Sequence, residues 1–207
     1  MTADGRARLW TSLRHPKLVH QTSSFTADDR YPELFRLVRS LAPDARRLLS
    51  FGCSTGEEIL SLRKLFPEAA IVGADINARS RKMAARLLGA DDCVAIVRPE
   101  NIQGKFDVIL ALSVFQRRPH EVMESGLMNI HRLYPFDRFD EEISRLVDRT
   151  IDGGILCVVN AQYRVEDCAA ASNLTAVLEA PDMIPPIFDR NGWSLAGTTA
   201  KTIFRKN

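Results

Sequence analysis

The chain has 207 residues and a formal net charge of +2, with 28 Lys and Arg against 26 Asp and Glu. This length suits one α/β domain, and the balanced charge lacks the clustered basic character of nucleic-acid-binding proteins, so we expect no nucleic-acid partner. No stretch resembles the core of a signal peptide or reaches the roughly 20 apolar residues of a membrane span. We therefore expect no membrane partner and a cytoplasmic location.

Residues 1–30 form a polar lead segment, and residues 31–207 are expected to form the domain. Apolar residues recur at helical spacing after Pro32 and stop at Pro43, which predicts a helix that flanks a sheet. The four cysteines are scattered without a close pair, so we expect neither a metal site nor a disulfide framework.

An apolar strand that begins near Leu48 runs into a turn bracketed by Gly52 and Gly56, and a helix-forming segment starts at Glu57. Glycines in such a turn adopt backbone angles closed to other residues and let a ligand approach the main chain. The start of the following helix offers amide groups to that ligand. The arrangement is typical of a nucleotide-binding turn.

The next apolar strand, from Ile71 to Ala74, ends in Asp75, nineteen positions after Gly56. This is where an α/β nucleotide fold places the carboxylate that binds a ribose diol. An aspartate here can also simply cap the following helix. Because Asp75 follows the glycine turn by one strand, we favour the ribose role.

Strand and helix patterns continue to alternate along the chain. The expected strands are 71–75, 93–97, 106–112 and 155–159, and the expected helices are 57–65, 78–87 and 139–149. Apolar strands separated by amphipathic helices predict a parallel sheet covered on both faces. After a turn at Asn191 and Gly192, residues 193–196 and 199–204 are expected to be two further strands.

The turn reads GCSTGEE over residues 52–58. It resembles the cofactor turn of class I S-adenosylmethionine-dependent methyltransferases, in particular that of the chemotaxis-receptor (CheR-type) glutamate methyltransferases. The resemblance implies a single-domain Rossmann-like α/β fold with a mostly parallel seven-stranded sheet, helices on both faces and an antiparallel last strand. It also implies S-adenosylmethionine as cofactor, and transfer of its methyl group to a nucleophilic acceptor.

By the same resemblance, the turn wraps the methionine end of the cofactor, and one of the two glutamates, with Glu57 favoured, holds its amino group. Asp75 binds the ribose hydroxyls, and Ile76 packs on the adenine. A polar residue after the third strand, Glu100 or Asn101, contacts the far adenine edge. The implied cofactor residues are Thr22, Gly52, Cys53, Ser54, Gly56, Glu57, Asp75, Ile76, Glu100, Asn101, Leu112 and Ser113.

In the lead segment, Thr22, Phe25 and Arg30 loosely follow a stretch that the chemotaxis enzymes fold over the cofactor, which suggests a lid. Ser113 at the end of the fourth strand could instead only cap the next segment. The chain lacks the Arg-Asn and Tyr-Phe pairs of those enzymes near this strand, and it has no room for their additional domains. A chemoreceptor substrate is therefore not expected.

Residues 116–135 form a long segment at the carboxyl edge of the expected sheet, where open α/β sheets bind ligands. We expect a small-molecule acceptor here, and the basic residues suit an acidic one. His120 and His131 are candidate general bases because histidine titrates near neutral pH. The candidates at this edge are Arg117, Arg118, His120, His131, Arg132, Tyr134, Asn160 and Tyr163, each of which is also compatible with an ordinary surface role.

Other function classes stay open. Residues 52–56 also satisfy Gly-x-Ser-x-Gly, the nucleophile elbow of α/β-hydrolases, in which Ser54 would be the nucleophile. In that fold several strands precede the elbow, whereas here it follows the first expected strand. An NAD(P)-binding oxidoreductase would favour Gly-x-Gly-x-x-Gly, which Ser54 and Glu57 interrupt. A non-enzymatic interaction module is the third alternative.

Overall fold

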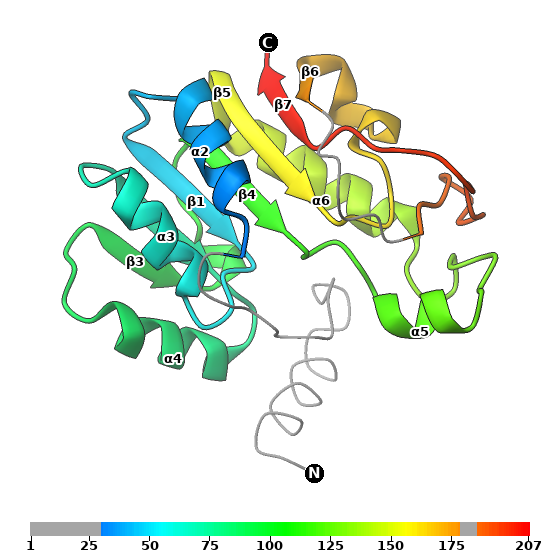
Figure 1. The fold of residues 1–207 in the computed structure, drawn as a ribbon, viewed down its shortest axis with the longest axis horizontal. Coiled ribbons are helices and arrows are strands. Elements are labelled where there is room, and N and C mark those ends of the chain that lie inside the picture. The colour runs from blue at the N-terminus through cyan, green and yellow to red at the C-terminus, as the bar shows by residue number, and fades with distance from the viewer. Residues whose placement is uncertain (1–29, 179–185) are drawn as a thin grey trace. The chain divides into compact units, whose positions relative to one another are not determined.

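The computed structural model describes residues 30–178 and 186–207. Thr22 and nearly all of the predicted lead segment lie outside the described residues, and so does its proposed role as a lid. The chain divides near residue 110 into two compact units, here called unit 1 (30–110) and unit 2 (111–207, with the gap). Figure 1 shows the elements of both.

Unit 1 consists of strands that alternate with helices. Its elements are α2 (Pro32–Leu41), β1 (Arg47–Phe51), α3 (Glu57–Leu65), β2 (Ala70–Ala74), α4 (Ala78–Leu88), β3 (Val94–Val97), the 3-10 helix η1 (Pro99–Asn101) and most of β4 (Phe106–Leu112). Strand β1 pairs in parallel with β2 and β4, and β2 pairs in parallel with β3. Leu48, Leu49 and Ile71 are fully buried, so the strands form the core of this unit.

Local sequence explains where the unit 1 helices begin. Pro32 occupies the first turn of α2, where its missing amide hydrogen costs nothing. Asn77 caps α4, because its side-chain oxygen accepts hydrogen bonds from the amides of Arg79 and Ser80. Helices α2 and α3 lie side by side in Figure 1.

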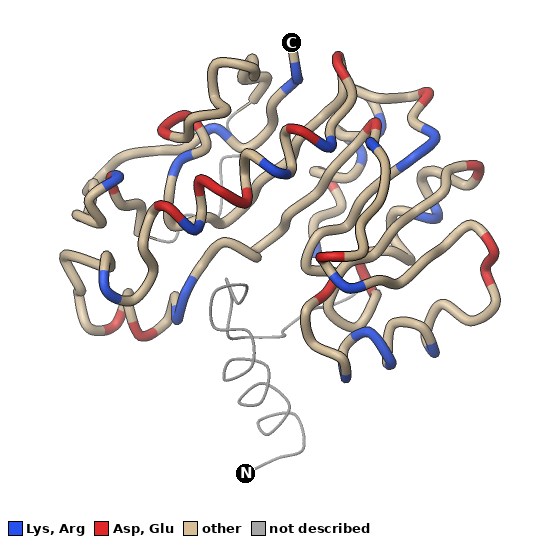
Figure 2. Tube along the Cα trace, turned by 180° about the vertical axis from the view of Figure 1, so that it is seen from behind, with Lys and Arg blue, Asp and Glu red and all other residues tan. Residues whose placement is uncertain are grey.

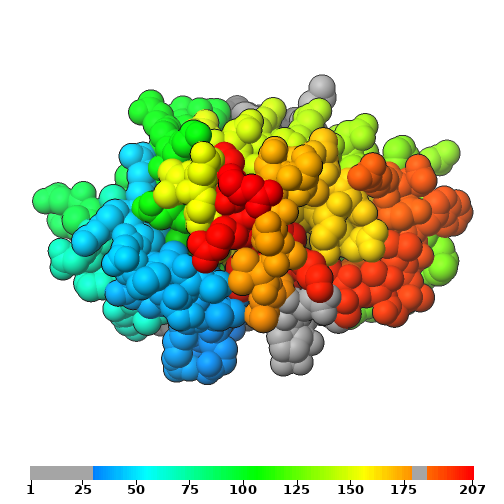
Figure 3. Space-filling view, turned by 90° about the horizontal axis from the view of Figure 1, so that it is seen from above, coloured from blue at the N-terminus to red at the C-terminus, as the bar shows by residue number. Residues whose placement is uncertain are grey.

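Unit 2 begins at the end of β4. It contains α5 (Pro119–Glu124), α6 (Phe136–Arg149), β5 (Thr150–Val159), the 3-10 helices η2 (Val165–Asp167) and η3 (Ala169–Asn173), β6 (Leu174–Leu178) and β7 (Ile203–Lys206). Strand β7 is antiparallel to both β5 and β6 and lies between them (Figure 3). Helix α6 buries Ile143 and Leu146 and packs on β5, while charges of both signs follow its length (Figure 2).

The strands form one seven-stranded sheet in the order β3-β2-β1-β4-β5-β7-β6. All pairings in unit 1 are parallel, and the antiparallel pairings are those of β7. The predicted α/β class and mostly parallel Rossmann-like sheet are therefore confirmed. None of the described helices has the length and apolar character needed to cross a bilayer.

The predicted strand at residues 193–196 is wrong. Asp189 Oδ1 accepts hydrogen bonds from the amides of Asn191 and Trp193, which closes a turn and leaves only isolated bridges at Trp193 and Ser194. The sixth strand is instead β6, which sequence reasoning missed because its side chains are mostly exposed and show no alternation. The last strand begins at Ile203, later than predicted.

Boundaries in the middle of the chain also differ from expectation. Helix α6 begins at Phe136 rather than Phe139, and β5 begins at Thr150, five residues before the expected start. The segment expected to be an irregular loop contains the short helix α5. Such shifts are usual at the ends of elements, where tertiary packing decides how far a pattern extends.

Candidate functional site

The glycine turn after β1 uses left-handed backbone angles at three positions. The φ angles are 78° at Gly52, 48° at Ser54 and 100° at Gly56, and only glycine adopts such angles without strain. The amides of Gly52 and Cys53 both donate to the Ala74 carbonyl oxygen, at 2.7 and 3.1 Å. The turn is therefore pinned to the end of β2, and these two amides are not available to a ligand.

Gly56 also has a packing role. A Cβ atom at this position would lie 3.1 Å from Ala84 Cβ on α4, closer than ordinary van der Waals contact. The residue thus lets the start of α3 approach α4, and it supplies the left-handed angle that turns the chain into the helix.

Asp75 directs its carboxylate toward the turn. Oδ2 accepts a hydrogen bond from the Ser54 amide at 2.9 Å, and Oδ1 accepts one from the Asn77 amide at 2.7 Å. Burial raises the pKa of Asp75, whereas these two amides and the nearby Arg81 lower it. Each carboxylate oxygen retains a further acceptor position, so the group is oriented and can still bind two hydroxyls.

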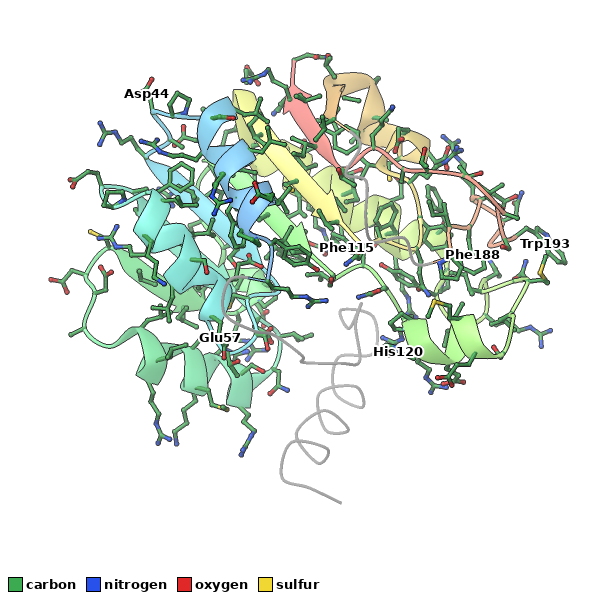
Figure 4. All side chains as sticks on the ribbon, in the orientation of Figure 1. Asp44, Glu57, Phe115, His120, Phe188 and Trp193 are labelled. Carbon is green, nitrogen blue, oxygen red and sulfur yellow. The ribbon has the colours of Figure 1, made fainter. Side chains whose placement is uncertain are left out.

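The two glutamates after the turn have different partners. Glu57, labelled in Figure 4, accepts hydrogen bonds from Thr55 Oγ1 at 2.8 and 2.7 Å. Glu58 accepts one from Ser50 Oγ at 2.7 Å, and burial raises the pKa of Glu58 to about 7 although Ser50 and Arg30 lower it. Ser50 was missed by sequence reasoning, although a serine inside a buried apolar strand was the available signal.

The predicted adenine contacts follow the ends of β2 and β3. Ile76 is partly exposed, and its carbonyl oxygen accepts a hydrogen bond from Arg81 Nη1 at 2.9 Å. Glu100 and Asn101 lie in η1 and are exposed, and Glu100 forms an ion pair with Arg98. The structure places these residues as expected after their strands, and their contact with adenine stays a prediction.

The end of β4 in unit 2 carries Leu112 and Ser113, both buried. Ser113 has a φ of 58°, and its amide donates to the Val159 carbonyl oxygen at 2.8 Å. Its hydroxyl accepts a hydrogen bond from Asn160 Nδ2 at 2.9 Å, and Asn160 itself has a φ of 57°. A hydrogen bond thus joins Ser113 and Asn160, two residues with strained backbone angles at the ends of β4 and β5.

The three candidate catalytic residues lie in different environments. His120 on α5 (Figure 4) and His131 are exposed and can meet an acceptor. Tyr134 is fully buried, with its ring centroid 5.5 Å from that of Tyr163, and burial raises the pKa of Tyr134 well above its usual range. Tyr134 therefore belongs to the core of unit 2, because the turn from Ile130 carries it inward, and we do not retain it as a catalytic candidate.

Comparisons with known proteins agree with this geometry. Residues 49–134 match a family described as a methyltransferase domain. No curated protein sequence matches the chain. The N-methyltransferase NodS from Bradyrhizobium japonicum WM9 has a TM-score of 0.52 at 16% identity, covering 86% of this chain and 98% of that one. The ribosomal protein L11 methylase from Lactobacillus delbrueckii subsp. bulgaricus has a TM-score of 0.53 at 17% identity, covering 87% and 81%.

Other similar structures are longer. CalS10, an amino pentose methyltransferase from Micromonospora echinaspora, has a TM-score of 0.49 at 15% identity, and the match covers 76% of this chain and 58% of that one. The chain spans 52 to 58% of the length of this structure and of three further similar structures.

The antiparallel β7 and the glycine turn facing Asp75 define a Rossmann-like methyltransferase fold. The stretch matched by the family model contains that turn, Asp75 and the end of β4. Residues 49–134 of the chain therefore resemble a methyltransferase domain, and the described residues have the Rossmann-like fold of such domains.

Proposed function

We propose that the protein transfers a methyl group from S-adenosylmethionine to a small or medium-sized nucleophilic acceptor and releases S-adenosylhomocysteine. The accepting atom is an oxygen or a nitrogen, including a carboxylate oxygen. The observation that carries the proposal is the Asp75 carboxylate, which is held toward the glycine turn by the Ser54 amide inside the matched methyltransferase domain.

The residues of unit 1 fit this cofactor. A ribose diol needs an acceptor with free lone pairs in a fixed direction, and the two amide bonds to Asp75 provide that direction. Glu57 or Glu58 would hold the amino group, and Glu57 is favoured because burial raises the pKa of Glu58 and so favours its neutral form. The left-handed angles at Gly52 and Gly56 would let the amino-acid end lie close to the main chain.

The cofactor supplies a methyl group on a sulfonium that already carries a good leaving group. The chain then has to bind the acceptor and align it, which accounts for much of the rate in such a displacement. A hydroxyl or ammonium acceptor must also lose a proton, and the exposed His120 or His131 is the candidate base. A carboxylate acceptor needs no base.

The acceptor is proposed to be a small molecule with an acidic group. Support comes from the arginines of unit 2 after β4, Arg117, Arg118 and Arg132. The likeness of the turn to the chemotaxis enzymes is proposed to concern cofactor binding alone, because the chain lacks the other features of their substrate sites. The cytoplasmic location stays a prediction.

The alternatives have less support. An α/β-hydrolase places its nucleophile after several strands, whereas Ser54 follows β1, the first described strand, and donates its amide to Asp75. A dinucleotide oxidoreductase would not explain the match of residues 49–134 to a methyltransferase domain.

The activity test is a screen for S-adenosylhomocysteine release from S-adenosylmethionine with acceptors grouped as hydroxyl, amine and carboxylate compounds. We expect release with one group, and much less release from the Asp75→Ala variant at the same cofactor concentration. Equal release from the variant and the parent would contradict the assignment of the site.

A further inference from the structure

A single buried glutamine fixes the main chain of Arg117. Gln162 Oε1 accepts a hydrogen bond from the Arg117 amide at 2.6 Å, and Gln162 Nε2 donates to the Arg117 carbonyl oxygen at 3.1 Å. The Gln162 amide donates a hydrogen bond to the Phe115 carbonyl oxygen, and the Gln162 carbonyl oxygen accepts one from the Phe188 amide, at 2.9 Å each. Phe115 and Phe188 are labelled in Figure 4. The loop after β4 is therefore locked to the loop after β5 at the residue that presents the guanidinium.

Backbone strain gathers in the same loops. Among the described residues, four other than glycine have a positive φ, and three of them are Ser113, Arg118 and Asn160, at 58°, 45° and 57°. Such residues persist where the surrounding structure imposes the strained angle, commonly at functional sites. These three follow the carboxyl ends of β4 and β5, the edge at which open α/β sheets bind ligands.

The charges at this loop repel one another. The Arg117 guanidinium is partly buried, and its pKa is lowered by that burial and by the cationic Arg138 and Arg118. Arg138 comes from α6, whereas Arg118 follows Arg117 directly and forms an ion pair with Glu121 at 3.3 Å. Arg117 thus lies in the positive field of Arg138 and Arg118, and such a field attracts anions.

We propose that Arg117 binds the carboxylate or phosphate group of the methyl acceptor, and that Gln162 is the positioning residue that fixes the main chain from which the Arg117 side chain extends. The planar guanidinium suits either anion because it donates two parallel hydrogen bonds. The inference rests on the proposed function only in naming the methyl acceptor as the molecule that carries the anion. The anion site itself can be tested without turnover.

The test is titration of the full chain with inorganic phosphate and, separately, with acetate, at constant ionic strength in chloride, followed by the amide NMR signals of residues 115–118. We expect saturable shifts with at least one anion, and the tighter of the two identifies the class of the acceptor group. Arg117→Gln should weaken binding about 10- to 100-fold, the worth of a charge-assisted hydrogen bond. The control Arg86→Gln, an exposed arginine of α4, should bind as the parent does.

Two outcomes would overturn the site: no saturable shift with either anion, or equal weakening in Arg117→Gln and Arg86→Gln. Titration with S-adenosylmethionine on the same samples keeps the two proposals apart. If the cofactor does not bind while phosphate or acetate does, the proposed function fails and the anion site stands.

The positioning role of Gln162 has its own measurement. Gln162→Met removes both hydrogen bonds to Arg117 at similar volume, and we expect about fivefold weaker anion binding with unchanged cofactor affinity. Arg117→Lys keeps the charge and removes the planar fork, so its affinity for the anion should also fall. Full anion affinity in Arg117→Lys would show that charge alone suffices and would contradict the directional role.

Discussion

The two units build their candidate sites in different ways. In unit 1 the cofactor turn is a short contiguous stretch, Gly52 to Gly56, closed by an aspartate 21 residues after Ser54. In unit 2 the candidate residues come from separate loops, and the hydrogen bonds that hold them span 45 residues for Arg117 and Gln162 and 47 for Ser113 and Asn160. The candidate cofactor turn is therefore encoded locally, whereas the candidate residues of unit 2 are brought together by the tertiary fold.

The largest effect should come from Asp75→Ala, which removes the proposed ribose-binding carboxylate of unit 1. Loss of two charge-assisted hydrogen bonds to the ribose should weaken S-adenosylmethionine binding about 100-fold, measured by calorimetry. Binding of phosphate or acetate in unit 2 should not change. Asp75→Asn keeps one acceptor oxygen and should lose about tenfold. Cofactor affinity unaltered by Asp75→Ala would refute the ribose assignment.

The second effect concerns turnover and the two candidate general bases of unit 2. If the accepting atom carries a proton, either His120→Ala or His131→Ala should lower turnover by about 100-fold, the usual contribution of a general base. Cofactor affinity should stay at the parental value in both variants, because these histidines lie outside the cofactor turn. Full turnover in both variants would remove general-base catalysis by these residues.

The third effect is on stability and returns to the cofactor turn. Gly56→Ala should reduce the free energy of unfolding by about 2 kcal/mol, since it imposes a φ of 100° on alanine and brings Cβ to 3.1 Å from Ala84 Cβ. Gly89→Ala is the matched control, with a φ of 62° and open space around the added atom, and should cost about 1 kcal/mol. Equal losses of unfolding free energy in the two variants, measured by urea denaturation, would show that the contact with Ala84 does not add to the cost of Gly56→Ala.

The smallest effect is the pH dependence contributed by Glu58. Its pKa in the folded chain is raised from 4.5 to about 7, so the folded state favours the neutral carboxyl. The stability that this proton supports is complete below pH 4.5 and declines as pH rises through 7, by on the order of 1 kcal/mol because the carboxyl keeps part of its hydration. Glu58→Gln should flatten this decline, and identical pH profiles would contradict the assignment.

The parts that sequence predicted are those with a local signal. Apolar strands such as Phe106–Leu112 and the helix after Asn77 follow from short patterns, as do the glycine turn and Asp75. Strand β6 has no alternation because most of its side chains are exposed, and the turn at Asp189 replaced a predicted strand. No sequence pattern shows that Gln162 clamps Arg117 or that Tyr134 turns inward, because both depend on contacts between distant segments.

The most direct test of the account is calorimetric titration of the full chain with S-adenosylmethionine, S-adenosylhomocysteine and NAD in parallel. The account predicts one-to-one binding of the first two and none of NAD, since in the proposed site the turn would hold an amino-acid end that NAD lacks. Binding of NAD without the sulfonium donor or its product would contradict it.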